Sequence, residues 1–165
     1  MPISSNKYKQ MSIKEFTKAA KIYDSGKSGI YEICKYDYPK VLTELKNTKF
    51  IVGDCENLPF EDESYDVIIC TNSFHHYPNP QDFFDSVYRV LRKGGRLILR
   101  DYTSSDLIVW LMNHIELPLA HLVGHGDVKI YKKEEYREML KKAGFRKMKV
   151  QAEEKFRCHI IAVKL

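Results

Sequence analysis

Two neighbouring stretches decide the fold of this chain: KFIVGDCENLPF at residues 49–60 and SYDVIICT at residues 64–71. Each contains a short apolar run that stops at a polar residue or a glycine, which is typical of a buried strand. The second run is apolar on both faces, as in a parallel strand that helices cover on both sides. Residues 54–65 give just the length that a parallel crossover connection requires.

Downstream of these stretches, helical and strand patterns alternate. Asn79 and Pro80 supply an N-cap and a first-turn proline for a helix that Gly94 and Gly95 end. The expected helices are the one from Pro80 to this glycine pair, 104–123 with a break at Pro118, and 131–142. The expected strands are 49–52, 66–71, 96–100, 145–152 and 156–163. The last two strands alternate like an antiparallel hairpin. The pattern predicts an α/β, Rossmann-like sheet of about five mostly parallel strands with helices on both faces.

Upstream, the sequence indicates helices. Ser12 and Glu15 have the spacing of a capping box and predict a short N-terminal helix. Residues 30–46 place most of their apolar side chains on one helical face, although Pro39 interrupts it. Neither a linker nor a repeat is visible, so we expect a single domain over 1–165, with a helical segment at 1–46 and the core at 47–165.

Composition and charge exclude several classes of protein. The apolar runs fall far short of the ~20 residues that a membrane span needs, and residues 1–10 lack the apolar region of a signal peptide. We therefore expect a cytoplasmic protein with no membrane partner and reduced cysteines. The net charge is +5, but the lysines of 132–149 are interleaved with glutamates on an expected solvated helix. This patterning argues against nucleic acid binding.

Three blocks of sequence resemble the second half of the class I S-adenosylmethionine (SAM) dependent methyltransferases, of the small-molecule type typified by ubiquinone and menaquinone biosynthesis enzymes. The blocks are FIVGDCENLPF (50–60), SYDVII (64–69) and VLRKGGRLIL (90–99), and AGF (143–145) follows at the expected place. Lys93 stands where that family usually has proline. The resemblance covers residues 48–165 and implies a methyltransferase core with SAM as its cofactor.

The resemblance also assigns site residues. It implies that Asp54 and Cys55 lie at the adenine of SAM, that Leu58 and Phe60 wall it, and that Asn72 borders the cofactor. Around the acceptor, it implies His75, Tyr77 and Asp101 as substrate-facing residues and His76 as a general base. The alternative for the two histidines is packing against the neighbouring prolines, and the alternative for Asp101 is a solvated strand end.

The family's glycine-rich SAM loop has no counterpart in the expected pattern. Residues 24–29 contain two glycines but follow no predicted strand, and Gly-Lys-Ser at 26–28 lacks the spacing of a phosphate-binding loop. If three or four charged hydrogen bonds are lost with the loop, SAM binding weakens by about 5 to 10 kcal/mol. We therefore expect weak or lost methyl transfer. A non-catalytic interaction module or a homodimerising pseudo-enzyme is the alternative.

A further expectation concerns the pairing of strands and of chains. With two family strands missing, the strands at 49–52 and 66–71 are expected to pair directly rather than leave an open apolar edge, and a homodimer could form on exposed helix surface.

His114, His121 and His125 have metal-compatible spacing on a continuous helix, but Pro118 should break that helix. We therefore predict no metal site.

Overall fold

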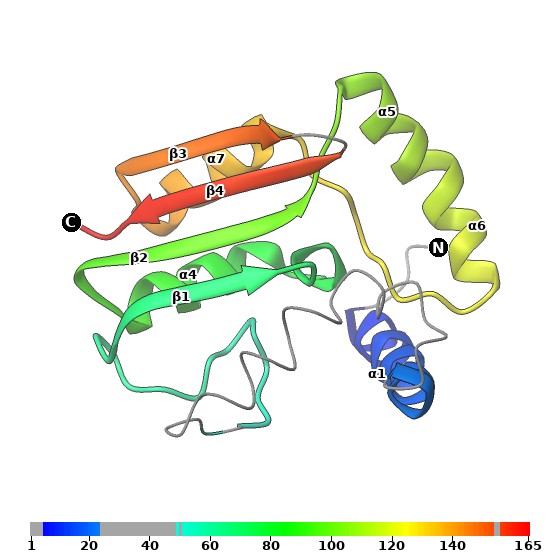
Figure 1. Ribbon diagram of the computed structural model, residues 1–165, viewed down its shortest axis with the longest axis horizontal. Helices are drawn as coiled ribbons and strands as arrows, with labels where there is room; N and C mark the ends of the chain where they lie inside the picture. Colours follow the sequence, from blue (N-terminus) through cyan, green and yellow to red (C-terminus); the bar gives the residue numbers. More distant parts are fainter. Residues whose placement is uncertain (1–4, 24–48, 50, 154–155) are drawn as a thin grey trace.

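The computed structural model describes residues 5–23, 49, 51–153 and 156–165. Its centre is a four-stranded sheet with the order β1-β2-β4-β3 (Figure 1). The strands are β1 (Tyr65–Thr71), β2 (Leu91–Tyr102), β3 (Lys147–Glu153) and β4 (Arg157–Val163). β1 is parallel to β2, whereas β4 is antiparallel to both β2 and β3. The predicted α/β class is confirmed, with four strands in the described part of the chain where about five were expected.

Helix α4 (Pro80–Val90) makes the crossover between the two parallel strands. Pro80 occupies the first turn as predicted, and Phe83, Phe84 and Val87 form the buried stripe. The predicted stop at the glycine pair is wrong, because β2 begins at Leu91, directly after the helix. Gly94 instead lies inside β2 with a φ of 81°, a left-handed conformation that side chains rarely adopt.

The segment before β1 differs from its prediction. Residues 49 and 51–53 belong to no strand, so neither the strand at 49–52 nor its direct pairing with β1 is present among the described residues. Val52 is fully exposed. β1 is an edge of the sheet, and Ile69 on one of its faces is 66% exposed. An apolar run forms a strand only where a neighbouring strand completes its hydrogen bonds, and no described strand pairs with this run.

The C-terminal part matches its prediction. Helix α7 (Lys133–Ala143) ends at Gly144, which has a φ of 110° and lies against the ring of Tyr88. This left-handed glycine is the usual end of a helix. β3 and β4 then form the antiparallel hairpin.

The predicted break at Pro118 is wrong. Helix α5 (Asp106–Leu111) continues through a π-helical turn (Met112–Glu116) into α6 (Leu117–Leu122). The proline is accommodated because the wider turn directly before it changes the local hydrogen-bond pattern. In the described part of the chain, no helix has both the length and the apolar character that crossing a membrane requires.

The N-terminal helix also differs from its prediction. Helix α1 (Ser5–Tyr23) begins seven positions before Ser12, so Ser12 and Glu15 lie inside it and form no capping box. Their side chains bind the loop after α6 instead: Ser12 Oγ donates to Gly126 O (3.2 Å), and Glu15 accepts from Gly126 N (2.9 Å). A Cβ atom on Gly126 would lie 2.4 Å from Ser12 Oγ, so the contact requires glycine.

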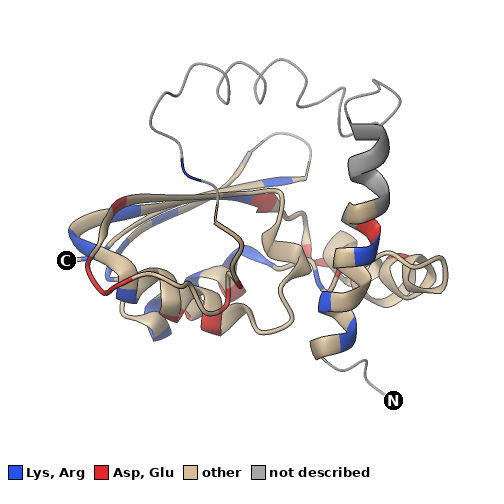
Figure 2. Ribbon diagram, turned by 90° about the horizontal axis from the view of Figure 1, so that it is seen from below, with Lys and Arg blue, Asp and Glu red and all other residues tan. Residues whose placement is uncertain are grey.

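The main core lies between the sheet and the helices α4 and α7, which pack together on one side of it (Figures 1 and 2). Phe74, directly after β1, is fully buried at its centre. The rings that surround Phe74 at centroid distances of 5.0 to 5.6 Å are Tyr77, Phe83, Phe84, Tyr131 and Tyr136. This packing fixes the loop that follows β1. The predicted helical segment at 30–46 and the glycines at 24–29 lie outside the described residues.

Candidate cofactor and acceptor site

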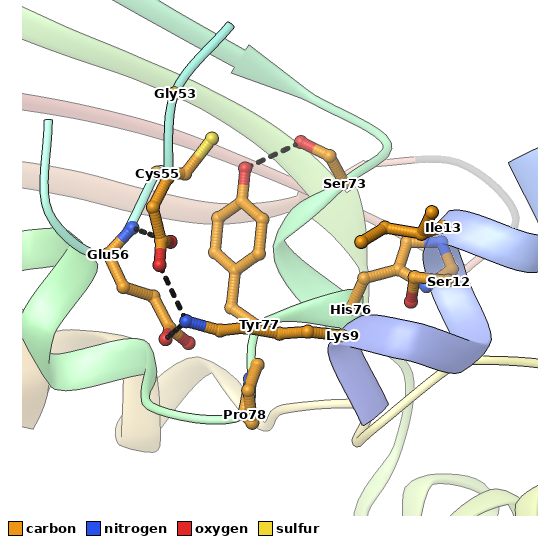
Figure 3. Close-up of a pocket in the computed structure, with 11 residues that line it drawn as sticks. Lys9, Ser12, Ile13, Gly53, Cys55, Glu56, Ser73, His76, Tyr77 and Pro78 are labelled. Carbon is orange, nitrogen blue, oxygen red and sulfur yellow. Dashed lines mark hydrogen bonds and ion pairs between the residues drawn. The ribbon is translucent and has the colours of Figure 1, made fainter. Parts of the chain in front are cut away.

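A cavity of about 550 Å³ lies beyond the C-terminal end of β1. Such a volume is typical of small-molecule sites, and the ends of parallel strands are where α/β sheets bind ligands. Three segments line it, as Figure 3 shows: α1, the turn 53–56 and the loop 73–78. The lining residues are Lys9, Ser12, Ile13, Gly53, Asp54, Cys55, Glu56, Ser73, His76, Tyr77 and Pro78. Four residues of the predicted site, Asp54, Cys55, His76 and Tyr77, are thus brought together.

The turn 53–56 is organised by its own backbone. Asp54 O accepts from Asn57 N at 3.0 Å, and Asp54 Oδ1 accepts from Glu56 N at 3.0 Å. Glu56 is buried and anchors the turn to the start of α4, because its carboxylate accepts from Asn79 N (2.6 Å) and Asn79 Nδ2 (3.0 Å). The turn is therefore held rigidly against the core.

Lys9 of α1 lies over this turn, and sequence reasoning missed it. Its Nζ is 2.7 Å from Asp54 Oδ2 and 2.8 Å from Glu56 Oε2 (Figure 3). The hydrogen bond from Lys9 lowers the pKa of Asp54, and the same bond, with that to Glu56, raises the pKa of Lys9. Both oxygens of the Asp54 carboxylate are therefore already hydrogen-bonded within the protein.

On the opposite wall, Tyr77 is held by hydroxyl contacts. Its OH is 3.0 Å from Ser73 Oγ, and Ser73 Oγ is 3.3 Å from Cys70 Sγ at the end of β1. Burial raises the pKa of Tyr77 and raises that of Cys70 to about 11, so both groups are neutral at pH 7. Tyr77 thus presents an oriented, neutral hydroxyl in the cavity wall.

His75 and Asp101 form a buried pair beside the cavity. Asp101, on β2, is 0% exposed and accepts from His75 N (3.2 Å), and its Oδ1 lies 2.6 Å from His75 Nδ1. The alternative of a solvated strand end is therefore wrong. Burial lowers the pKa of His75, but hydrogen bonds to Asp101 and Asp127 outweigh it and raise the pKa to about 9. His75 does not line the cavity and is charged at pH 7.

His76 has the opposite electrostatic environment. Burial lowers its pKa, and the neighbouring charged His75 lowers it further. Its Nδ1 lies 3.6 Å from Asp127 Oδ1. Because the ring is neutral at pH 7 and lines the cavity, it can act as a proton acceptor.

Three predicted cofactor residues do not line the cavity. Leu58 packs against the main core, and Phe60 makes an edge contact with Tyr65 at 4.9 Å. Asn72 has a φ of 50°, and its Oδ1 accepts a short hydrogen bond from Arg157 Nη1. Leu58 and Phe60 therefore pack outside the wall of this cavity.

The three histidines with metal-compatible spacing lie apart. His114 stacks on Trp110, His121 Nε2 lies 2.6 Å from Asp127 O, and His125 Nδ1 lies 2.7 Å from Glu15 Oε1. In the described residues, the helix that carries the first two is continuous, yet the three do not form a ligand cluster.

Known proteins that are similar to this chain are methyltransferases. Residues 25–99 match the family model described as a methyltransferase domain. A Mycobacterium ulcerans protein, phthiotriol/phenolphthiotriol dimycocerosates methyltransferase 1, is 42% identical over 79 residues, which are 47% of this chain and 29% of that protein. The corresponding Mycobacterium tuberculosis protein is 35% identical over 100 residues, 60% of this chain and 35% of that protein. The family match and these relatives support the resemblance to the class I SAM-dependent methyltransferases.

Solved structures give the same methyltransferase fold. The YcgJ protein from Bacillus subtilis superposes with a TM-score of 0.59 over 81% of this chain and 77% of that chain, at 19% identity. By contrast, this chain spans only about a third of the length of the two mycobacterial relatives. The family match begins at residue 25, upstream of the region in which the resemblance was seen.

SAM, the cofactor of this methyltransferase family, fits the described residues at one end. The cavity volume, the rigid turn 53–56 and the carboxylate of Asp54 suit an adenosine group. Lys9, however, already binds the Asp54 oxygen that would accept a hydrogen bond from an adenine amine. The predicted absence of a glycine-rich loop concerns residues 24–48, which lie outside the described part of the chain.

Proposed function

We propose that this chain binds SAM through the turn 53–56 and supports methyl transfer to a small molecule in the same cavity. The observation that carries the proposal is the cavity itself, which joins Asp54 and Cys55 to His76 and Tyr77. The first two residues serve the adenosine end, and the last two border the acceptor. Leu58 and Phe60 pack outside the wall of the cavity.

His76 is proposed to take the proton that the acceptor loses. Bound SAM supplies a methyl group on a sulfonium sulfur, and an attacking hydroxyl or amine must release its proton when it becomes methylated. The neutral ring of His76 can accept this proton because it lines the cavity. Tyr77, fixed by Ser73, orients the acceptor through its hydroxyl.

The proposed SAM affinity is weak. The amine of adenine competes with Lys9 for the Asp54 carboxylate, so part of the binding free energy is lost in weakening an existing ion pair. The carboxylate still accepts from Glu56 N at its other oxygen. This competition adds to the weakening expected if the glycine-rich loop is missing.

The acceptor is proposed to be an apolar small molecule. The mycobacterial relatives are named for phthiotriol and phenolphthiotriol dimycocerosates. In this chain, α6 lies beside α1 at the cavity, since the rings of Tyr8 and His121 make an edge contact at 5.3 Å. The α5–α6 region carries a row of exposed apolar side chains: Leu107, Trp110, Leu111, Ile115, Leu119, Leu122 and Val123. An apolar chain leaving the cavity can lie against them.

Calorimetric titration with SAM tests the function. We expect saturable binding that the Asp54→Asn variant weakens and the Lys9→Gln variant strengthens. Asp62→Asn is the matched control, because Asp62 is an exposed carboxylate that pairs with Arg89 away from the cavity. Absence of SAM binding in both the parent chain and the Lys9→Gln variant would refute the proposal. Amide chemical shifts of Asp54 and Cys55 locate the bound ligand.

The same exposed apolar surface favours one alternative, a non-catalytic interaction module. Val123 is 77% exposed at the end of the row on α5–α6, and large exposed apolar patches mark interaction sites. This alternative predicts self-association, measured by sedimentation, that Leu119→Lys abolishes. SAM binding without self-association would exclude it.

A further inference from the structure

Three side chains at the edge of the cavity form a group, and the proposed methyltransferase role uses only one of them, His76. His75 and His76 belong to the short helical turn η1 (Phe74–His76), and Asp127 belongs to the loop between α6 and α7. Each offers one ligand atom, and these atoms all lie within 4.8 Å of one another. Two histidines and one carboxylate are a donor set that proteins use for Zn²⁺ and Fe²⁺.

Two of the three distances within the group match those expected around a tetrahedral metal, and the third is within 4.8 Å. Ligand atoms at about 2.0 to 2.2 Å from Zn²⁺ are about 3.3 to 3.5 Å from one another at tetrahedral angles. Asp127 Oδ1 lies 3.3 Å from His75 Nε2 and 3.6 Å from His76 Nδ1. The second distance is too long for a hydrogen bond, yet it matches the edge of a coordination polyhedron.

A second layer of contacts orients the first. Asp101, fully buried, binds His75 Nδ1 at 2.6 Å, which directs Nε2 toward Asp127. A carboxylate behind a ligating histidine is the common arrangement at zinc sites, where it fixes the tautomer and the ring. The backbone holds the loop as well, because His75 O accepts from Val128 N at 2.7 Å and from Lys129 N at 3.2 Å.

The group is partly open to solvent, although His76 Nδ1 itself is buried. The side chain of Asp127 is 26% exposed and that of His76 is 12% exposed, and His76 also lines the cavity. Three protein ligands leave a fourth position for water or for an oxygen of a bound molecule, as in catalytic zinc sites.

We propose that His75 Nε2, His76 Nδ1 and Asp127 form a three-ligand site for a first-row divalent metal ion of the Zn²⁺ type, with Asp101 as the positioning residue behind His75. The site shares His76 with the proposed proton acceptor. A neutral imidazole that binds metal through Nδ1 carries its hydrogen on Nε2, so the ring cannot also take up a proton. We therefore expect the metal-loaded protein to bind SAM normally but to lose the proton-acceptor role of His76.

The test is a titration of the chelator-treated full chain with Co²⁺ and, separately, with Zn²⁺. We expect one equivalent of Co²⁺ to give the intense visible absorption of a tetrahedral site, and Zn²⁺ to displace it. His76→Gln and Asp127→Asn should abolish this absorption, and Asp101→Asn should weaken affinity roughly 10- to 100-fold. His114→Gln is the matched control, because His114 is an exposed histidine away from the group.

The proposal would be overturned by the absence of a tetrahedral Co²⁺ spectrum in the parent chain, or by a spectrum that survives in His76→Gln or in Asp127→Asn. Loss of the spectrum in His114→Gln would also overturn it, because it would show that the metal binds at His114. Far-UV circular dichroism of each variant confirms that it is folded. Because SAM binding is measured with chelator present and metal binding without SAM, failure of either proposal leaves the other intact.

Discussion

Raising the pH of the chelator-treated protein from 6.5 to 9 is expected to weaken its fold, through His75. The folded protein holds the proton of this ring more tightly than the unfolded chain does, because Asp101 and Asp127 raise its pKa from 6.5 to about 9. The stabilisation is complete below pH 6.5, declines as the pH rises, and is lost above 9. A pKa difference of this size corresponds to about 3 kcal/mol at most.

Urea unfolding at a series of pH values measures this loss as a decrease in the midpoint. The range from pH 6.5 to 9 suits this measurement. The pKa of Cys70 is raised to about 11, so its ionisation in the folded protein lies above the range, and the pKa of His76 is lowered, so its protonation lies below it. Asp127→Asn should retain part of the dependence, because Asp101 remains. His114→Gln should retain all of it. A midpoint that stays constant from pH 6.5 to 9 would refute the assignment of a charged His75.

Three substitutions test the fold and the site. Phe74→Ala should lower the free energy of unfolding by about 3 to 5 kcal/mol in urea, because it empties the centre of the core. Gly144→Ala should lower it by more than about 1 kcal/mol, since the new Cβ would lie 2.9 Å from the ring of Tyr88 and the φ of 110° disfavours any side chain. Lys9→Gln should raise the pKa of Asp54 toward its ordinary value, as carboxyl chemical shifts during an acid titration would show.

Each of these has a control. Phe60→Ala should cost less than Phe74→Ala, because Phe60 is only partly buried. Gly124 has a φ of 93° but open space around it, so Gly124→Ala should show the backbone cost alone and less loss than Gly144→Ala. Lys14→Gln on the same helix should leave the pKa of Asp54 unchanged. Equal effects within any of these pairs would contradict the corresponding structural reason.

The parts of the fold that follow from local pattern were predictable. α4, α7, β1 and the β3–β4 hairpin lie where periodicity, a first-turn proline or a terminal glycine placed them. The prediction of a strand at 49–52 was wrong because strand formation depends on a neighbouring strand, which local pattern does not reveal. The prediction of a break at Pro118 was wrong because a π-helical turn can admit a proline. The sequence of residues 112–116 gives no signal for such a turn.

The site was predictable on one side only. Asp54, Cys55, His76 and Tyr77 came from the resemblance, whereas Lys9 lies 45 positions before its partner and was missed. The pair of His75 with Asp101 had a usable signal. β1 and β2 are parallel neighbours, and both residues follow the paired stretch in which Thr71 faces Arg100. Side chains at the ends of adjacent parallel strands meet at one edge of the sheet.

The glycine at position 126 lets helix α1 lie close to the loop after α6. The backbone of α1 approaches this residue so closely that even one methyl group would overlap Ser12. A larger residue there would push the N-terminal helix outward and carry the ammonium group of Lys9 off the carboxylate of Asp54. The position of Lys9 over Asp54 therefore depends on Gly126, a residue some seventy positions after the turn 53–56.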